Sequence, residues 1–219
     1  MLLTGCSFES HPVPPEGVPT IRLSTTPDPV PPRTEELVQL TRDGGRITFD
    51  ENWEVSDGVW MMTDRGIPEI WRPELSSNGL LMDSDPHVLW VMSPGMYGAY
   101  PTRVVVYSEP PPVPRRCEDV VEAPLRVESG NPVVFDSDGP SRSLGLPRGD
   151  VRVRLCATGL DEAYGEPEFD GDDLDLHVSA SRFRLQVWPA TWRPGEIVKV
   201  GSTYARDEHA RVAAAHTSS

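Results

Sequence analysis

The sequence predicts an all-β protein, a single antiparallel β-sandwich or partly open barrel with short terminal helices. Two observations predict this fold. Short runs of β-branched and aromatic residues recur along the chain, and turn-forming pairs such as Asp57-Gly58 and Pro194-Gly195 separate them. In addition, no apolar helical period persists between residues 34 and 203. Many short strands punctuated by turns are typical of sandwiches and barrels.

The expected strands are short runs that alternate with these turns. They cover residues 46–49, 59–62, 88–92, 103–107, 120–127, 133–135, 151–156, 182–188 and 197–200. Pro124 lies within one of them, and because proline cannot donate to a central ladder, it places that strand at an edge or a bulge. Only residues 35–40 and 207–215 have a helical character.

Two strands show a regular alternation of apolar and polar residues, in the stretches DVRVRLCA and SRFRLQVWP. Successive side chains of a strand point to opposite faces of the sheet. One face of the pair is therefore apolar, with Val151, Val153, Leu155, Phe183, Leu185 and Val187. The other face is expected to be exposed to solvent. If the strands pair, the arginines of that second face form an exposed basic stripe: Arg152, Arg154, Arg182 and Arg184.

The chain divides into three parts by composition. Residues 1–33 are expected to comprise a truncated export signal followed by an extended tether rich in proline, serine and threonine. Residues 34–205 form the predicted sandwich domain. Residues 206–219 are expected to be a short helix and a disordered tail.

Cys6 follows Leu3, Thr4 and Gly5, the residue order of a bacterial lipoprotein processing site. A complete signal requires an apolar stretch of roughly 7–15 residues, and only Met1, Leu2 and Leu3 precede Thr4 here. Either the signal is truncated or the match is accidental, and we favour the first. The interpretation predicts an extracytoplasmic protein of the cell envelope that meets the membrane only through a lipid on Cys6. A cytoplasmic location is the alternative.

The two other cysteines, Cys117 and Cys156, allow two interpretations. An oxidising compartment would join them in a disulfide. In a reducing cytoplasm they would be buried thiols. Neither lies in a spacing suited to zinc, and no metal or cofactor is expected.

The charge of the chain restricts its partners. A net charge of −14, with Lys199 as the one lysine, argues against a nucleic-acid binder, because phosphate contacts require clustered lysines and arginines. An acidic surface suits solubility or a basic protein partner. The sequence contains no GxSxG, HExxH or Gly-rich phosphate loop, so we expect a protein that is not an enzyme.

Two segments are candidates for contact with a partner. The loop GEPEFDGDDLDLH contains Asp170, Asp172, Asp173 and Asp175. It does not fit the calcium-loop pattern, and either a solvated loop or an acidic docking surface accounts for it. In SPGMYGAYP, Tyr97 and Tyr100 would suit a binding contact if exposed, and packing at the edge of the core is the alternative.

The stretch from Glu122 to Ala163, with the turn Leu146-Pro147-Arg148-Gly149-Asp150, resembles the carboxy-terminal half of the competence-associated nuclease inhibitor family, ComJ. The strand ending LQVWPA is similar to one in uncharacterised actinobacterial proteins. The resemblance implies a small β-sandwich that binds and blocks a nuclease or toxin through an acidic surface. The function expected is therefore a binding module, with a structural or small-ligand-binding envelope lipoprotein as the alternative.

Overall fold

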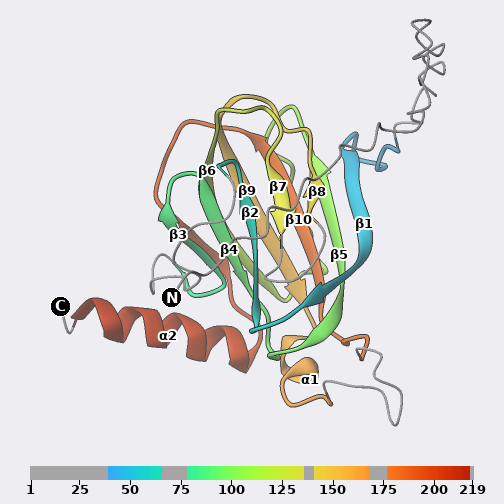
Figure 1. Cartoon of the computed structure of the whole chain (residues 1–219). Coiled ribbons are helices and arrows are strands. Elements are labelled where there is room, and N and C mark those ends of the chain that lie inside the picture. Colours follow the sequence, from blue (N-terminus) through green and yellow to red (C-terminus); the bar gives the residue numbers. More distant parts are fainter. Residues whose placement is uncertain (1–38, 66–77, 136–140, 168–176, 218–219) are drawn as a thin grey trace, which may run out of the picture. The chain divides into compact units, whose positions relative to one another are not determined.

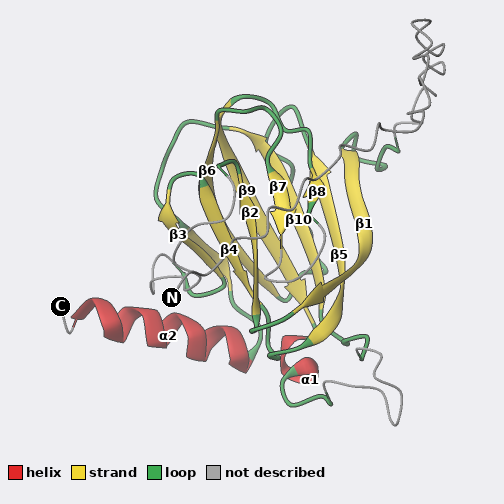
Figure 2. Cartoon of the chain, viewed as in Figure 1, coloured by secondary structure: helices red, strands yellow, loops and turns green. Residues whose placement is uncertain are grey.

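The computed structural model of the chain describes residues 39–65, 78–135, 141–167 and 177–217 (Figure 1). Its strands form two sheets, as the sequence predicts (Figure 2). The elements are β1 (Arg46–Val55), β2 (Val59–Thr63), β3 (Leu81–Asp85), β4 (Val88–Met92), β5 (Gly98–Val106), β6 (Asp119–Val127), β7 (Val133–Phe135), β8 (Arg142–Ser143), β9 (Gly149–Thr158), α1 (Leu160–Ala163), β10 (Arg182–Pro189), β11 (Glu196–Lys199) and α2 (Thr203–Thr217).

The larger sheet has six strands in the order β1-β5-β10-β9-β6-β11, and the smaller has five in the order β3-β4-β2-β7-β8. All pairs are antiparallel except β5 and β10, which run parallel. The sheets face one another across a core that includes Trp60, Leu89, Val104, Leu155 and Leu185, each at most 1% exposed. Burial of one such side chain contributes roughly 1.5–3 kcal/mol.

Every expected strand is present, and two further strands lie between them. The first, β3, has the sequence LMDSD, whose acidic residues weaken the strand signal. It pairs with β4 through a register shift between Met82 and Asp85. The second, β8, has only two residues. Tertiary pairing, rather than local propensity, therefore makes these segments strands.

Pro124 lies on β6, the strand next to the edge strand β11. On one side it pairs with Arg152 of β9. On the other side, β11 pairs only with Val120, Val121 and Glu122. The last of these pairs is two residues short of Pro124, so the proline occupies a local edge of the sheet, where a missing N–H is tolerated.

The predicted helices have different outcomes. Leu40 is not helical but forms an isolated bridge with Arg46, so the helix expected over 35–40 is wrong at this residue. Residues 35–38 lie outside the described residues. The carboxy-terminal helix is confirmed as α2, and it begins at Thr203, before residue 207. Ser202 explains the earlier start, because its Oγ accepts a hydrogen bond from the Ala205 amide at 3.0 Å, as an N-cap residue does.

The predicted pairing of the two arginine-bearing strands is confirmed, but the predicted exposure of their arginines is wrong for β9. In β9, Arg152 is 1% exposed and Arg154 is 6% exposed. Two connecting segments cover this face of the sheet. The carbonyl of Pro111 accepts a hydrogen bond from Arg154 at 2.8 Å, and the carbonyls of Arg193 and Pro194 accept from Arg152 at 2.9 Å. Segments that are distant in sequence thus cover and bury the β9 arginines. The alternation of apolar and polar residues along the strand does not predict this burial.

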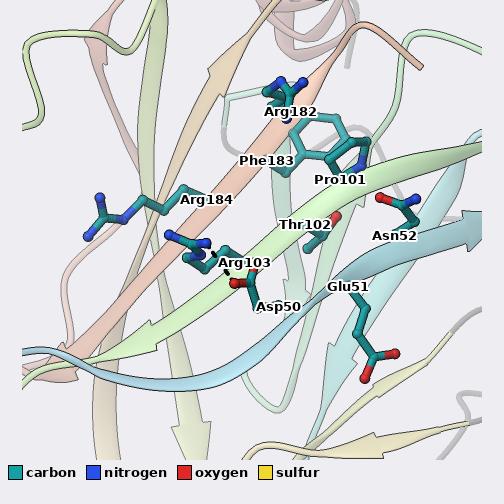
Figure 3. A pocket seen from close by; sticks show the side chains of 9 residues that line it. All are labelled: Asp50, Glu51, Asn52, Pro101, Thr102, Arg103, Arg182, Phe183 and Arg184. Atoms are coloured by element: carbon teal, nitrogen blue, oxygen red, sulfur yellow. Dashed lines mark hydrogen bonds and ion pairs between the residues drawn. The ribbon is translucent and has the colours of Figure 1, made fainter. Parts of the chain in front are cut away.

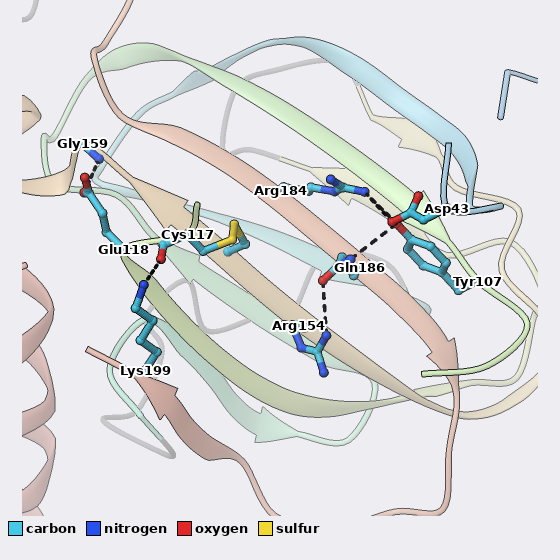
Figure 4. The surroundings of a disulfide bond; sticks show 10 residues. Asp43, Tyr107, Cys117, Glu118, Arg154, Gly159, Arg184, Gln186 and Lys199 are labelled. Atoms are coloured by element: carbon cyan, nitrogen blue, oxygen red, sulfur yellow. Dashed lines mark hydrogen bonds and ion pairs between the residues drawn. A yellow bond between two sulfur atoms is a disulfide. The ribbon is translucent and has the colours of Figure 1, made fainter. Parts of the chain in front are cut away.

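Cys117 and Cys156 form a disulfide, with their Cα atoms 5.4 Å apart (Figure 4). Cys156 lies on β9, opposite Val120 of β6 in the strand register. Cys117 ends the proline-rich connection that follows β5. The bond therefore joins this connection to the outer face of the six-stranded sheet. Among the described residues, no helix is long and apolar enough to cross a membrane.

Candidate protein-binding site

Exposed apolar side chains gather at one end of the sandwich, which we call the loop end. It comprises the β1–β2 turn, the β4–β5 loop, α1 and the residues after it, residues 177–181 and the start of α2, and Figure 1 shows these elements together. Its exposed apolar residues are Met96 (52%), Tyr97 (39%), Tyr164 (68%) and Val178 (51%). Tyrosine and methionine are enriched in the cores of protein interfaces.

The β4–β5 loop is held in place from both sides. The amide of Gly58 donates to the Met96 carbonyl at 2.8 Å, and the amide of Ser93 donates to the Gly58 carbonyl at 3.0 Å. Inside the loop, the Ser93 hydroxyl donates to the Gly95 carbonyl at 3.0 Å. These bonds present Met96 and Tyr97 from a fixed backbone, which reduces the entropy that a partner must remove on binding.

The two tyrosines predicted for partner contact occupy different environments. Tyr97 is 39% exposed, whereas Tyr100 is 2% exposed. The Tyr100 ring lies against Phe183 with ring centroids 5.6 Å apart, and its hydroxyl accepts from the Gly95 amide at 3.1 Å. The expected exposed contact at Tyr100 is therefore corrected: this side chain belongs to the core and positions the loop that carries Tyr97.

Glu166 links the two ends of the loop over residues 165–177, which we call the acidic segment. Its carboxylate accepts hydrogen bonds from the Ser179 hydroxyl at 3.0 Å and from the Ala180 amide at 3.2 Å. His177 Nε2 lies 3.8 Å from the same carboxylate. The predicted site residues between these ends, Asp170, Asp172, Asp173 and Asp175, lie outside the described residues.

The end of the acidic segment is also attached directly to the β4–β5 region. Ala99 donates to the His177 carbonyl at 2.9 Å and accepts from the Ser179 amide at 2.9 Å. Val178 thereby forms a parallel bridge with Ala99. Ala99 is two residues from Tyr97 in the chain. The exposed side chains of Tyr97 and Val178 therefore lie close to the carboxy-terminal end of the acidic segment.

The start of α2 completes the loop end. The carboxylate of Asp161 accepts hydrogen bonds from the amides of Thr203 (2.9 Å) and Tyr204 (2.8 Å), which lower its pKa. The Tyr204 hydroxyl donates to the Ser93 carbonyl at 2.8 Å, and its ring centroid lies 5.6 Å from that of Tyr164. Burial, together with the charge of Glu208, raises the pKa of Tyr204. This hydroxyl therefore stays protonated and keeps its hydrogen bond at any physiological pH.

Acidic residues also lie on the elements of the loop end. Asp57 lies in the β1–β2 turn, Asp161 and Glu162 lie in α1, and Glu166 follows α1. Protein interfaces typically combine an apolar core with a polar rim, and the loop end offers residues of both kinds.

A buried charge cluster lies on the outer face of the six-stranded sheet, beneath the connections that cover it. The Glu122 carboxylate accepts hydrogen bonds from Arg152 at 2.9 Å, from Arg154 at 2.7 Å and from Arg193 at 3.0 Å. Burial acts to raise the pKa of Glu122, but the hydrogen bonds and charges of Arg152 and Arg154 outweigh it and hold the pKa below 4.5.

Further contacts engage the arginines of this cluster. Glu196 lies 3.2 Å from Arg152 and 2.9 Å from Arg193. Arg154 stacks over the Trp188 ring at 4.8 Å and lies 3.4 Å from the Gln186 side-chain oxygen (Figure 4). Because ion pairs within the chain engage all three arginines and both oxygens of Glu122, we interpret the cluster as structural: it fastens the covering segments to the sheet.

A polar pocket of about 540 Å³ opens on the same sheet, over β1, β5 and β10 (Figure 3). We call it the arginine pocket, and its lining residues are Asp50, Glu51, Asn52, Pro101, Thr102, Arg103, Arg182, Phe183 and Arg184. The sequence pattern does not predict this pocket, because its walls come from three strands that are distant in sequence. Within the described part of the chain, no group of three metal-ligating side chains is present.

No protein family model matches the chain, and no curated protein sequence matches it. Two solved structures are similar to part of it. One is described as crocagin biosynthetic gene J, with a TM-score of 0.42 and 16% identity, covering 65% of this chain and 98% of the other. The second is ComJ of Bacillus subtilis, an inhibitor of the DNA-degrading activity of NucA, with a TM-score of 0.44 and 10% identity over 65% of this chain and 99% of ComJ. Neither similarity carries a functional residue over to this chain.

Proposed function

We propose that the protein is a non-enzymatic binding module that recognises a basic protein partner through the loop end. The observation that carries the proposal is the gathering of Met96, Tyr97, Tyr164 and Val178 in exposed positions on hydrogen-bonded segments. Rigid exposed aromatic groups bind with little loss of conformational entropy. They are therefore the expected anchors of the interface.

The acidic groups supply the second part of the proposed interface. Asp57, Asp161, Glu162 and Glu166 lie on elements of the loop end, and the chain as a whole has a net charge of −14. We propose that Asp170, Asp172, Asp173 and Asp175 extend this negative surface. Such a surface accelerates the approach of a basic partner and makes its association rate fall with increasing salt concentration.

The resemblance of residues 122–163 to the nuclease inhibitor family suggests the class of partner. We propose a basic nuclease or toxin, which the module would bind and inhibit. The partner can be identified by replacing Tyr97 with a photo-crosslinking amino acid and isolating the adduct formed in cells of the source organism. The binding constant for the purified partner is then measured by calorimetry.

The matched variants are Tyr97→Ser and Leu40→Ser. Leu40 is also exposed, at 66%, but lies beside Arg46 at the start of β1, whereas the loop end includes the turn after Val55. Loss of an interface anchor typically weakens binding by 2 kcal/mol or more, roughly thirtyfold. Tyr97→Ser is expected to show this loss and Leu40→Ser to bind normally. Equal binding by both variants would reject the loop end as the interface.

The acidic segment has its own test. Replacement of Asp170, Asp172, Asp173 and Asp175 by serine is expected to slow association and to flatten its salt dependence. Unchanged association kinetics would remove this segment from the interface while leaving the aromatic anchors in place.

A second candidate function is that of an envelope lipoprotein anchored through Cys6. The Cys117–Cys156 disulfide favours it, because disulfides persist in oxidising compartments. We propose that a diacylglycerol group on Cys6 supplies two acyl chains, which is sufficient for stable anchoring. Detergent partitioning of the full natural gene product tests this: wild type should enter the detergent phase and Cys6→Ala should not. Membrane association that survives Cys6→Ala would contradict the anchor.

A further inference from the structure

The arginine pocket shares no residue with the loop end and has a different chemistry. Its cations come from two neighbouring strands, β5 and β10, which run parallel with Arg103 opposite Arg184. Because side chains two residues apart in a strand share a face, Arg182 lies on the same face as Arg184. The topology thus places three guanidinium groups along one surface of an acidic protein.

The carboxylates around the pocket neutralise only part of this charge. Asp50 pairs with Arg103 at 2.6 Å. Asp43 lies 3.6 Å from Arg184. The remaining lining carboxylate, that of Glu51, lies 4.0 Å from Arg142 of the other sheet. Two carboxylates therefore face three guanidinium groups, and the pocket has an excess positive charge.

The excess charge is on Arg182. Figure 3 shows the Arg184 side chain directed away from the pocket, and its guanidinium donates to the Tyr107 hydroxyl at 2.7 Å. Arg182 is exposed, and its guanidinium has no ion-pair or hydrogen-bond partner among the residues that the structure describes. Arg103 also faces the pocket, and the described pair with Asp50 uses one of its terminal nitrogens.

We propose that the arginine pocket binds a carboxylate-bearing ligand, with Arg182 as its principal anchor. Arginine presents two parallel N–H groups that match the two oxygens of a carboxylate. The Arg103–Asp50 pair shows that a guanidinium group of the pocket wall binds a carboxylate, here through one contact of 2.6 Å with both side chains 44% exposed. Asn52, on β1, also lines the pocket. Its side-chain amide can donate a hydrogen bond to the rest of the ligand or accept one from it.

The size of the pocket suits a small ligand. Binding sites for small molecules typically have volumes of about 300–1,000 Å³, and this pocket has about 540 Å³. A free organic acid and an acidic side chain of a peptide offer the same carboxylate chemistry. The proposal concerns a site that the loop-end interface does not include, so each can fail without the other.

Calorimetric titration of the full chain at low ionic strength tests the proposal. The probes are succinate, a Glu-containing tripeptide with a blocked carboxy terminus, and inorganic phosphate. We expect saturable binding of succinate or of the peptide, and whichever binds identifies the source of the carboxylate. Arg182→Gln is expected to weaken this binding about tenfold or more, the loss typical of one charge-assisted hydrogen bond. Arg182→Lys keeps the positive charge but lacks the two parallel N–H groups of a guanidinium. Its affinity should lie between those of wild type and Arg182→Gln.

The control is Arg115→Gln, because Arg115 is also exposed but lies on the proline-rich connection outside the pocket. It should bind as wild type does. Circular dichroism and the urea midpoint verify that each variant is folded. The proposal is overturned if neither carboxylate probe binds, if Arg182→Gln binds as tightly as Arg115→Gln, or if phosphate binds as tightly as the carboxylates.

Discussion

Arg154 and Glu122 form an ion pair of 2.7 Å whose side chains are only 7% and 3% exposed. Arg152 donates to the second oxygen of the same carboxylate at 2.9 Å. Glu122→Gln would remove the ion pair of Arg154 and leave Arg152 with Glu196 alone. Removal of one partner of a buried pair typically costs about 3–5 kcal/mol, and we expect this loss in the free energy of unfolding, measured with urea. Glu128→Gln, at an exposed pair with Arg65, should cost less than about 1 kcal/mol. Similar losses for the two variants would contradict the structural role of the cluster.

The same carboxylate predicts how stability depends on pH. Its pKa in the folded protein lies below the ordinary value of 4.5 because the hydrogen bonds from Arg152 and Arg154 outweigh the effect of burial. The unfolded state therefore takes up a proton first as the pH falls. The contribution of Glu122 is complete above pH 4.5 and is lost as the pH falls through the folded pKa. Urea midpoints measured from pH 6 downwards should fall more steeply for wild type than for Glu122→Gln. Parallel curves would show that other groups dominate acid unfolding.

The Cys117–Cys156 bond closes a loop with a sequence separation of 39 residues. In the chain-entropy model a loop of this length stabilises the folded state by about 4 kcal/mol. The Cys117→Ala, Cys156→Ala double variant is expected to lose stability of this order. A reducing agent should lower the urea midpoint of wild type and leave that of the double variant unchanged. If the reducing agent leaves wild type unaffected after labelling confirms free thiols, the expected stabilisation is absent.

Gly79, two residues before β3, permits α2 to pack closely against the backbone at this point. A Cβ atom at this position would lie 2.7 Å from the Glu208 carbonyl oxygen, and the backbone has φ +80°. Gly79→Ala should therefore destabilise the protein and increase hydrogen exchange in α2. Gly44 is the matched control, since it has φ +83° with no atom within 4 Å of its Cβ position. Gly44→Ala should show the backbone cost alone, about 1–2 kcal/mol. Equal losses for both would mean that α2 adjusts to the added methyl group.

Tyr97 and Tyr100 should respond differently to substitution. Tyr100→Phe removes the hydroxyl that accepts from the Gly95 amide, and it should cost about 1 kcal/mol in stability. Tyr97→Ser should leave stability within about 0.5 kcal/mol, as is usual for exposed positions, and should weaken partner binding. Thermal unfolding and calorimetric binding separate the two effects. A Tyr97 variant that is unstable but binds normally would reverse the assigned roles.

The strand pattern was readable from the sequence because apolar alternation and turn residues are local signals. The pairing of β9 with β10 follows from two such strands, and Ser202 was a local signal for the start of α2 that the helical pattern alone did not use. By contrast, β3 has an acidic sequence and becomes a strand through its pairing with β4. The arginine pocket could not be predicted either, because Asp50, Arg103 and Arg182 come together only through the order of the strands in the sheet.

The sequence by itself determined the all-β class, most of the strands, the acidic charge and the even pair of cysteines beyond Cys6. The tertiary structure decided which of the alternating side chains are exposed. Arg152 and Arg154 have the same sequence pattern as Arg182 and Arg184, yet the first two are buried beneath connecting segments and Arg182 is exposed to water. Periodicity specifies the face of a sheet on which a side chain lies. Only the packing of distant segments determines whether that face is covered.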